Sequence, residues 1–88
     1  MYKIVLSTQA EKFYRRLFAT NKDIFLRIDN SLKALQTDPY RGKPLKGKLK
    51  GKYSLRVGVY RIVYSVERQE IAVYILDISH RRESYRFN

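Results

Sequence analysis

A chain of 88 residues, 44% of them hydrophobic, has the composition of a small globular protein, so we expect residues 1–88 to form one domain. It has no cysteine and one histidine, which excludes disulfides and thiolate metal sites, and we expect neither a metal nor a cofactor. The net charge of +11, from 19 basic and 8 acidic residues, favours a polyanion or an acidic protein as partner.

Nothing in the sequence predicts a membrane segment. No apolar run approaches the roughly 20 residues that span a bilayer, and the opening MYKIVLSTQ lacks the form of a signal peptide. We therefore expect a soluble cytoplasmic protein without a membrane partner.

The first part of the chain predicts a strand and two helices. Residues 1–6 are rich in β-branched and aromatic side chains, and Ser7-Thr8 then predicts a helix start, with Thr8 and Glu11 spaced as in a capping box. A second helix is predicted over residues 22–36. The connection between the helices is short, so they should pack as an antiparallel hairpin. Their apolar stripes are Ala10, Phe13, Tyr14, Leu17 and Phe18, then Ile24, Phe25, Ile28, Leu32 and Leu35.

Residues 39–51 contain three glycines and both prolines of the chain, which predicts a loop. From Pro39 to Val66 there is no acidic residue, whereas a surface that only keeps a protein dissolved usually mixes both signs. We therefore expect the lysines of this loop to contact phosphate. They are Lys43, Lys46, Lys48 and Lys50.

Residues 53–57 and 60–66 predict two strands joined by Gly58-Val59, because glycine at the first position of a two-residue loop suits a type II′ turn. That turn sets a register in which Arg56 faces Arg61. Two facing cations repel by about 0.2–1 kcal/mol, a cost that an anion between them would offset. The face expected to meet the helices carries Tyr53, Leu55, Val57, Tyr60, Ile62 and Tyr64, and the other carries Lys52, Ser54, Arg56, Arg61, Val63 and Ser65.

Residues 71–79 are apolar on both faces, as expected for a strand near the middle of a sheet, and lead directly into a run of titratable and cationic residues. The predicted order is β-α-α-β-β-β. This is an α+β fold in which an N-terminal helical hairpin packs on a small, mainly antiparallel four-stranded sheet. The first strand could pair beside the third or the fourth.

The chain has no motif for nucleotide binding, no nucleophilic-serine motif and no usefully spaced carboxylate pair, so metal-assisted hydrolysis has little support. Cleavage of RNA needs no nucleophile from the protein, because RNA carries its own, the 2′-hydroxyl. Cations can stabilise charge on the phosphate, and a lysine, histidine or tyrosine can move the proton. A basic sheet face ending in His80, Arg81 and Tyr85 contains these groups.

Two segments carry a family resemblance: KxLxGxxxxxYSLRVGVYRIVYSV from Lys43 onward, and the C-terminal ISHRRESYR. With the order of elements, they make the whole chain resemble the RelE-type toxins, or mRNA interferases, of the RelE/ParE toxin–antitoxin superfamily. The resemblance implies a ribosome-dependent, metal-independent endoribonuclease. Such an enzyme cuts messenger RNA in the ribosomal A site and leaves a 2′,3′-cyclic phosphate and a 5′-hydroxyl.

The resemblance also implies roles for single residues. Lys52 would help to activate the 2′-hydroxyl, and Arg61 would stabilise the phosphate in the transition state. Arg81 would stabilise the phosphate or protonate the leaving group, Tyr85 would orient the substrate base, and His80 would act as an acid or base. The RNA- and ribosome-binding residues would be Lys43, Lys46, Lys48, Lys50, Arg56, Arg82 and Arg86.

One position departs from the best-studied branch of the family. That branch has a second lysine two positions after the first, where this chain has Ser54. Lys48, Lys50 or His80 could take its role.

The expected partner is a cognate antitoxin, which would wrap the basic surface with an acidic or amphipathic segment that folds on binding. The toxin alone should be monomeric and form a hetero-oligomer with the antitoxin. Two alternatives remain: a ParE-like inhibitor that binds DNA gyrase without RNA chemistry, and a non-catalytic RNA- or ribosome-binding module of the same fold. The set Lys52, Arg61, Arg81 and Tyr85 favours the ribonuclease.

Overall fold

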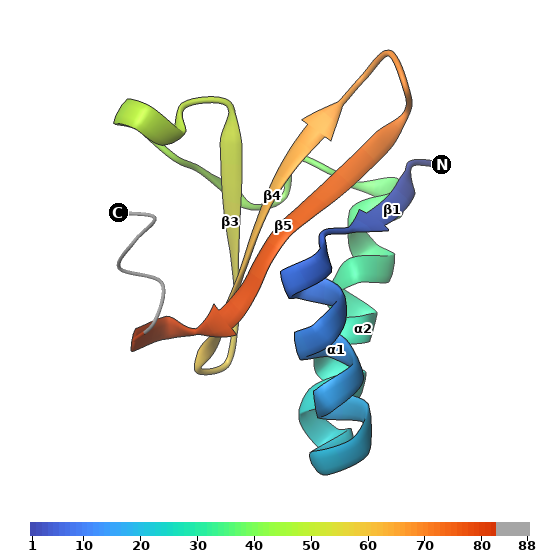
Figure 1. Ribbon diagram of the computed structural model, residues 1–88. Coiled ribbons are helices and arrows are strands. Elements are labelled where there is room, and N and C mark those ends of the chain that lie inside the picture. The colour runs from blue at the N-terminus through green and yellow to red at the C-terminus, as the bar shows by residue number, and fades with distance from the viewer. Residues whose placement is uncertain (83–88) are drawn as a thin grey trace.

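The computed structural model describes residues 1–82 and places two α-helices and five strands among them (Figure 1). After the first strand, both helices come before the remaining four strands. This order confirms the expected α+β class. A short 3-10 helix, Gly47–Leu49, lies between the second and third strands. The elements are β1 (Lys3–Leu6), α1 (Thr8–Thr20), α2 (Lys22–Thr37), β2 (Lys43–Pro44), β3 (Lys52–Val57), β4 (Tyr60–Glu67) and β5 (Ala72–His80).

The strands form one sheet in the order β1-β5-β4-β3-β2, and both helices pack against one of its faces (Figure 1). β1 runs parallel to β5, whereas the other neighbouring strands are antiparallel. The first strand therefore lies beside the last strand of the four expected. The expected count was one strand short, because Lys43 and Pro44 pair with Ser54 and Tyr53 inside the segment predicted to be a loop.

The cap of α1 differs from the one that the sequence indicates. Ser7 is the capping residue, and its Oγ accepts a hydrogen bond from the Ala10 N–H at 3.1 Å. The expected capping box of Thr8 and Glu11 is therefore wrong. With Ser7 as the cap, the third helical position is Ala10, which has no carboxylate to reach back. Glu11 instead lies 3.3 Å from the Arg15 guanidinium.

One residue, Asn21, separates the two helices. Its N–H donates to the Leu17 carbonyl at 2.8 Å, and its side-chain oxygen accepts from the Ile24 N–H at 3.2 Å. Asn21 thus ends α1 and caps α2, so the chain reverses as the predicted hairpin. α2 continues to Thr37, one residue past its expected end.

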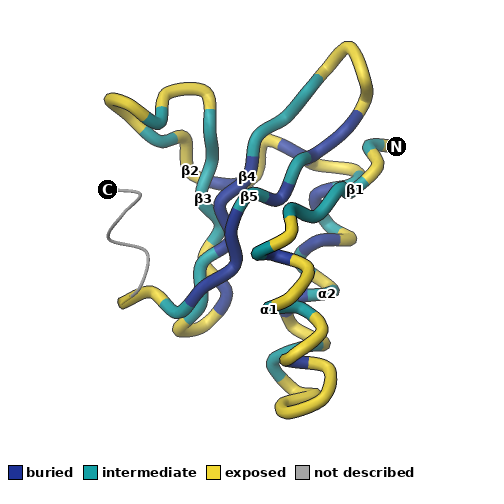
Figure 2. The backbone as a smooth tube through the Cα atoms, viewed as in Figure 1, coloured by how far each residue is buried: buried dark blue, intermediate teal, exposed yellow. Residues whose placement is uncertain are grey.

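Apolar side chains of the helices bury against β4 and β5. Ile28 of α2, Ile62 of β4 and Ile75 of β5 have no exposed surface. Phe13 of α1 packs edge-on against Tyr60, with ring centroids 5.7 Å apart. Figure 2 shows buried stretches along β4 and β5 in the middle of the sheet. β4 is also one strand of the β3–β4 hairpin, which carries the basic residues.

The predicted register of the β3–β4 hairpin is confirmed, with Arg56 directly opposite Arg61. Gly58 has a φ of +60° while Val59 keeps a negative φ, as the predicted type II′ turn requires. Because side chains alternate along a strand, Lys52, Arg56 and Arg61 lie together on the face opposite the helices.

Candidate nucleic-acid interface

The face of the sheet opposite the helices carries a line of cations, here called the basic face. It begins with Arg56 and Arg61, which are paired across β3 and β4. Lys52 lies on the same face of β3, four residues from Arg56, which corresponds to about 14 Å along the strand. Arg56 is exposed, and Lys52 and Arg61 are partly buried. The three cations form an extended stripe suited to a polyanion rather than one closed site for a small ion.

The lysines between α2 and β3 divide into two groups. Lys43 belongs to β2, where its partner across the sheet is Ser54 of β3. The other three surround the 3-10 helix: Lys46 precedes it, Lys48 lies within it and Lys50 follows it. All four are exposed, so they extend the positive charge from the sheet edge into the adjoining loop.

β2 is fixed to the sheet by a contact that the sequence does not signal. The Gly42 N–H donates to the Tyr64 Oη at 2.9 Å, and both groups are buried. A Cβ on Gly42 would lie 2.5 Å from that oxygen and 3.0 Å from the Ser54 carbonyl oxygen, so only glycine fits. Burial raises the pKa of the Tyr64 hydroxyl, although the Gly42 N–H partly offsets this. The chain is therefore tightly placed immediately before Lys43.

An acidic side chain lies within the basic face. Asp77 of β5 is 2% exposed, and its Oδ2 accepts a hydrogen bond from the buried Ser79 hydroxyl at 2.8 Å. Asp77 is paired with Val63 and Ser79 with Arg61, so Asp77 lies diagonally across from Arg61. The sequence alone gives no sign of this relation to Arg61. The bulge between Val63 and Tyr64 is what aligns it, and bulges leave no clear signal in a sequence.

His80 lies on the other face of the sheet. It is the direct partner of Tyr60, whose side chain packs against the helices, and the two rings meet edge to face at 5.7 Å. Its Nδ1 accepts the Arg82 N–H at 3.3 Å, which leaves Nε2 as the other nitrogen for a neutral ring to protonate. The structure therefore does not bring His80 together with Arg61.

The cations after β5 are placed only in part. Arg81 and Arg82 are exposed, and the Arg81 N–H donates to the Val59 carbonyl at 2.8 Å. This bond holds the start of the C-terminal segment against the β3–β4 turn. Tyr85 and Arg86 lie outside the described residues.

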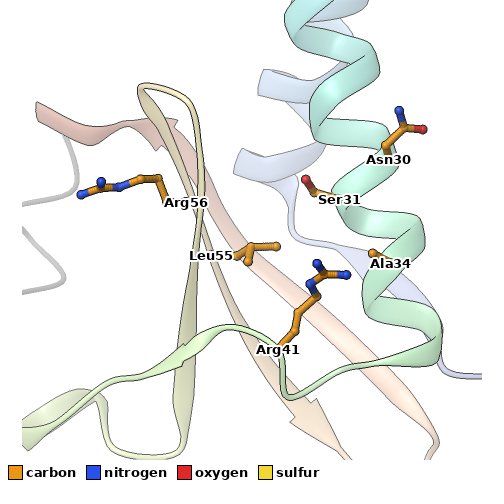
Figure 3. A pocket seen from close by; sticks show the side chains of 6 residues that line it. All are labelled: Asn30, Ser31, Ala34, Arg41, Leu55 and Arg56. Carbon is orange, nitrogen blue, oxygen red and sulfur yellow. The ribbon is translucent and has the colours of Figure 1, made fainter.

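A pocket of about 240 Å³ opens between α2 and β3 (Figure 3). Figure 3 shows Arg41 reaching into this space, whereas Arg56 extends away from it on the other side of β3. The guanidinium groups of Arg41 and Arg56 therefore lie on different surfaces of the protein. The lining residues are Asn30, Ser31, Ala34, Arg41, Leu55 and Arg56.

Two further findings concern residues 1–82. No group of three or more His, Asp or Glu side chains comes together there in a way that could bind a metal ion. Neither helix in this part of the chain is long and apolar enough to cross a membrane.

Comparison with known proteins places the chain in a family. The sequence model of the family described as "ParE toxin of type II toxin-antitoxin system, parDE" matches residues 4–85. The chain belongs to this toxin family.

Two curated toxins of Mycobacterium tuberculosis are similar to it. Toxin RelG is 42% identical over 53 residues, which cover 59% of this chain and 61% of RelG. Toxin RelE is 44% identical over 55 residues, which cover 61% of this chain and 57% of RelE. The match thus spans about three fifths of the length of each curated relative.

The fold agrees over a longer stretch. A chain of the toxin–antitoxin complex RelBE2 from Mycobacterium tuberculosis superposes with a TM-score of 0.78 at 30% identity, covering 90% of this chain and 96% of that one. The resemblance to RelE-type toxins of the RelE/ParE superfamily is confirmed.

In this RelE-type toxin, the fold brings some of the expected residues together and separates others. Lys43, Lys52, Arg56 and Arg61 share one face of the sheet. His80 lies on the opposite face. Such a face can hold a polyanion and stabilise charge on phosphate oxygens without a metal ion.

Proposed function

We propose that this toxin is a ribosome-dependent endoribonuclease that cuts messenger RNA and so inhibits translation. The observation that carries the proposal is the pairing of Arg56 with Arg61 on the basic face, with Lys52 on the same strand. Two guanidinium groups held opposite each other favour an anion between them. The cytoplasm, where messenger RNA is translated, is the proposed site of action.

The proposed reaction needs no metal ion. The 2′-oxygen of one nucleotide attacks the adjacent phosphorus and loses its proton to a base, which forms the O2′–P bond. The P–O5′ bond breaks, and O5′ takes up a proton. The products are a 2′,3′-cyclic phosphate and a 5′-hydroxyl, so atoms and charge balance without a co-reactant.

The basic face suits three parts of this reaction. Lys52 assists removal of the 2′-proton, and Arg61 stabilises the negative charge that grows on the phosphate oxygens. Arg81 stabilises the same charge or delivers the proton to O5′. Tyr85 orients the base in this proposal. His80 is left out of this proposal, because it lies on the opposite face of the sheet from Arg61.

We further propose that a cognate antitoxin restrains the toxin. The net charge of +11 favours an acidic segment as the inhibitor. The similarity to a chain of the RelBE2 toxin–antitoxin complex supports such a partner. An antitoxin on the basic face would compete with RNA for Arg56 and Arg61.

The test uses programmed ribosomes, with cut sites mapped by primer extension. The wild-type toxin should cut the message in codon register, and Arg61→Ala should lower the single-turnover rate at least about 100-fold. Arg68→Ala, which removes an exposed arginine from the β4–β5 turn, should cut like the wild type. Uncut message with the wild-type toxin would overturn the proposal.

Inhibition of DNA gyrase is the second candidate, because the matching family is described by its ParE members. A supercoiling assay run beside the ribosome assay separates the two. Blocked supercoiling with intact message would support gyrase inhibition. Salt-sensitive ribosome binding with neither effect would support a non-catalytic module.

A further inference from the structure

The basic face has a gap in its middle row. Along β3 and β4, Lys52 is paired with Ser65, Ser54 with Val63, and Arg56 with Arg61. Successive rows lie about 7 Å apart, since each is two residues along a strand. The first and third rows therefore carry cations, and the hairpin itself supplies none to the row between them.

The neighbouring strand fills that row. Lys43 of β2 is the direct partner of Ser54, so the two residues share the basic face. Directly opposite residues have Cβ atoms about 4.5–5.5 Å apart, and the long lysine side chain can extend over the serine. The short Ser54 side chain leaves that space open. Lysine, serine and valine thus follow one another across β2, β3 and β4.

Lys43 is held in place by the residues on both sides of it. The preceding Gly42 donates its N–H to the buried Tyr64 hydroxyl at 2.9 Å. The following segment is tied by the Leu45 N–H, which donates to the Lys52 carbonyl at 2.9 Å. Lys46, Lys48 and Lys50 have no such position, because they lie beyond the paired residues of β2.

We infer that Lys43 is a catalytic residue of this toxin, whose ammonium group contacts the substrate phosphate in the middle row of the basic face. This inference rests on the proposed ribonuclease function and extends it. Lys43 supplies the cation that Ser54 lacks, from a different strand and from 11 positions earlier in the chain. Lys52, Lys43 and the Arg56–Arg61 pair then form a continuous line of positive charge.

The experiment compares single-turnover cleavage rates on programmed ribosomes at saturating toxin, so that differences in affinity cancel. Lys43→Gln should lower the rate about 10- to 100-fold, as expected for loss of one cation at a phosphate. Lys12→Gln is the control, because Lys12 is also an exposed lysine but belongs to α1, which packs on the opposite face of the sheet. Its rate should stay within about twofold of the wild type.

A rescue variant gives the sharper readout. Lys43→Gln combined with Ser54→Lys restores a lysine to the same row of the same face, and should recover the rate to within about fivefold of the wild type. A merely structural role for Lys43 would not be repaired by a lysine on another strand. Thermal unfolding of each variant shows whether it is folded.

Three outcomes separate the inference from the function on which it rests. A wild-type chain that leaves the message intact overturns the proposed function and the inference together. If the wild type cuts and Arg61→Ala does not, the function stands. The inference is then overturned if Lys43→Gln cuts like Lys12→Gln, or if adding Ser54→Lys to Lys43→Gln restores nothing.

Discussion

Arg56 and Arg61 are direct partners across β3 and β4, so two guanidinium groups stand opposite each other on one face of the sheet. Like charges in this position destabilise a sheet by about 0.2–1 kcal/mol. Arg56→Gln should therefore raise the free energy of unfolding by about that amount in dilute chloride. Added sulfate should narrow the difference, because a divalent anion between the arginines stabilises the wild type more.

Urea unfolding with and without sulfate measures this effect. Arg68→Gln is the control, because it removes the same charge from an exposed turn. A lower stability of Arg56→Gln in dilute chloride would contradict the explanation.

Gln9 acts as a short extension of the sheet beyond β1. Its amide nitrogen donates to the Ile78 carbonyl at 2.9 Å, and its amide oxygen accepts the Ile78 N–H at 3.0 Å. Gln9→Ala leaves both groups of the part-buried β5 backbone without this partner. We expect a loss of about 1–3 kcal/mol in the free energy of unfolding. Thr8→Ala, at the exposed neighbouring position, should change it by less than about 0.5 kcal/mol. Equal effects of the two substitutions would argue against the bridge.

The Tyr14–Asp29 hydrogen bond makes stability depend on pH at both ends of the range. The Tyr14 Oη donates to Asp29 Oδ1 at 2.6 Å, and Lys33 lies 3.1 Å from Oδ2. The bond from Tyr14 lowers the pKa of Asp29, so its stabilisation is present above the unfolded pKa of about 4 and is lost as pH falls further. Burial, followed by the bond to Asp29, raises the pKa of Tyr14 to about 12. That stabilisation is lost as pH rises from about 10 toward 12.

Tyr14→Phe should lower the free energy of unfolding by about 1–2 kcal/mol near neutral pH, because the bond joins a hydroxyl to a charged group. It should also flatten the pH dependence below pH 4 and above pH 10. Lys33→Gln should cost less than about 1 kcal/mol, since the lysine side chain is 69% exposed. Urea unfolding across a pH series measures the free energy of unfolding of the wild type and both variants. If Tyr14→Phe lost stability below pH 4 as steeply as the wild type does, the Tyr14–Asp29 bond would not be the cause.

Gly42 should tolerate no side chain. Gly42→Ala places a Cβ 2.5 Å from the Tyr64 Oη, so the sheet must move to accept it. We expect a loss of about 1–3 kcal/mol in the free energy of unfolding. Combined with Tyr64→Phe, which removes the closest atom, the loss should be smaller than the sum of the two single losses. Lys43→Ala, one residue away and exposed, should leave stability within about 0.5 kcal/mol. Additive losses would mean that Tyr64 is not the obstacle.

The local features of the fold were predictable from the sequence. Two apolar stripes with a 3.6-residue period gave the helices, and the Gly58 turn gave the pairing of Arg56 with Arg61. Each depends on residues close together in the chain. Their physical signal is therefore contained in a short window.

The features that depend on contacts between segments far apart in the sequence were not predictable. The partner of β1 depends on packing across the whole sheet, and the sequence left two options open. β2 was hidden among glycines and prolines, because two residues make too short a pattern to show alternation. For the candidate site, alternation placed Arg56, Arg61 and Lys52 on one face. It could not place Lys43 beside Ser54, because that depends on β2.

The parallel pairing of β1 with β5 also affects when the sheet can form during synthesis of the chain. During synthesis, β1 leaves the ribosome before the helices and before the other described strands, yet its partner in the sheet is the last of those strands to be made. Until β5 emerges, the helical hairpin has only part of the surface against which it packs. Pairings between such distant segments form slowly. A newly made chain can therefore complete its sheet only after β5 has emerged.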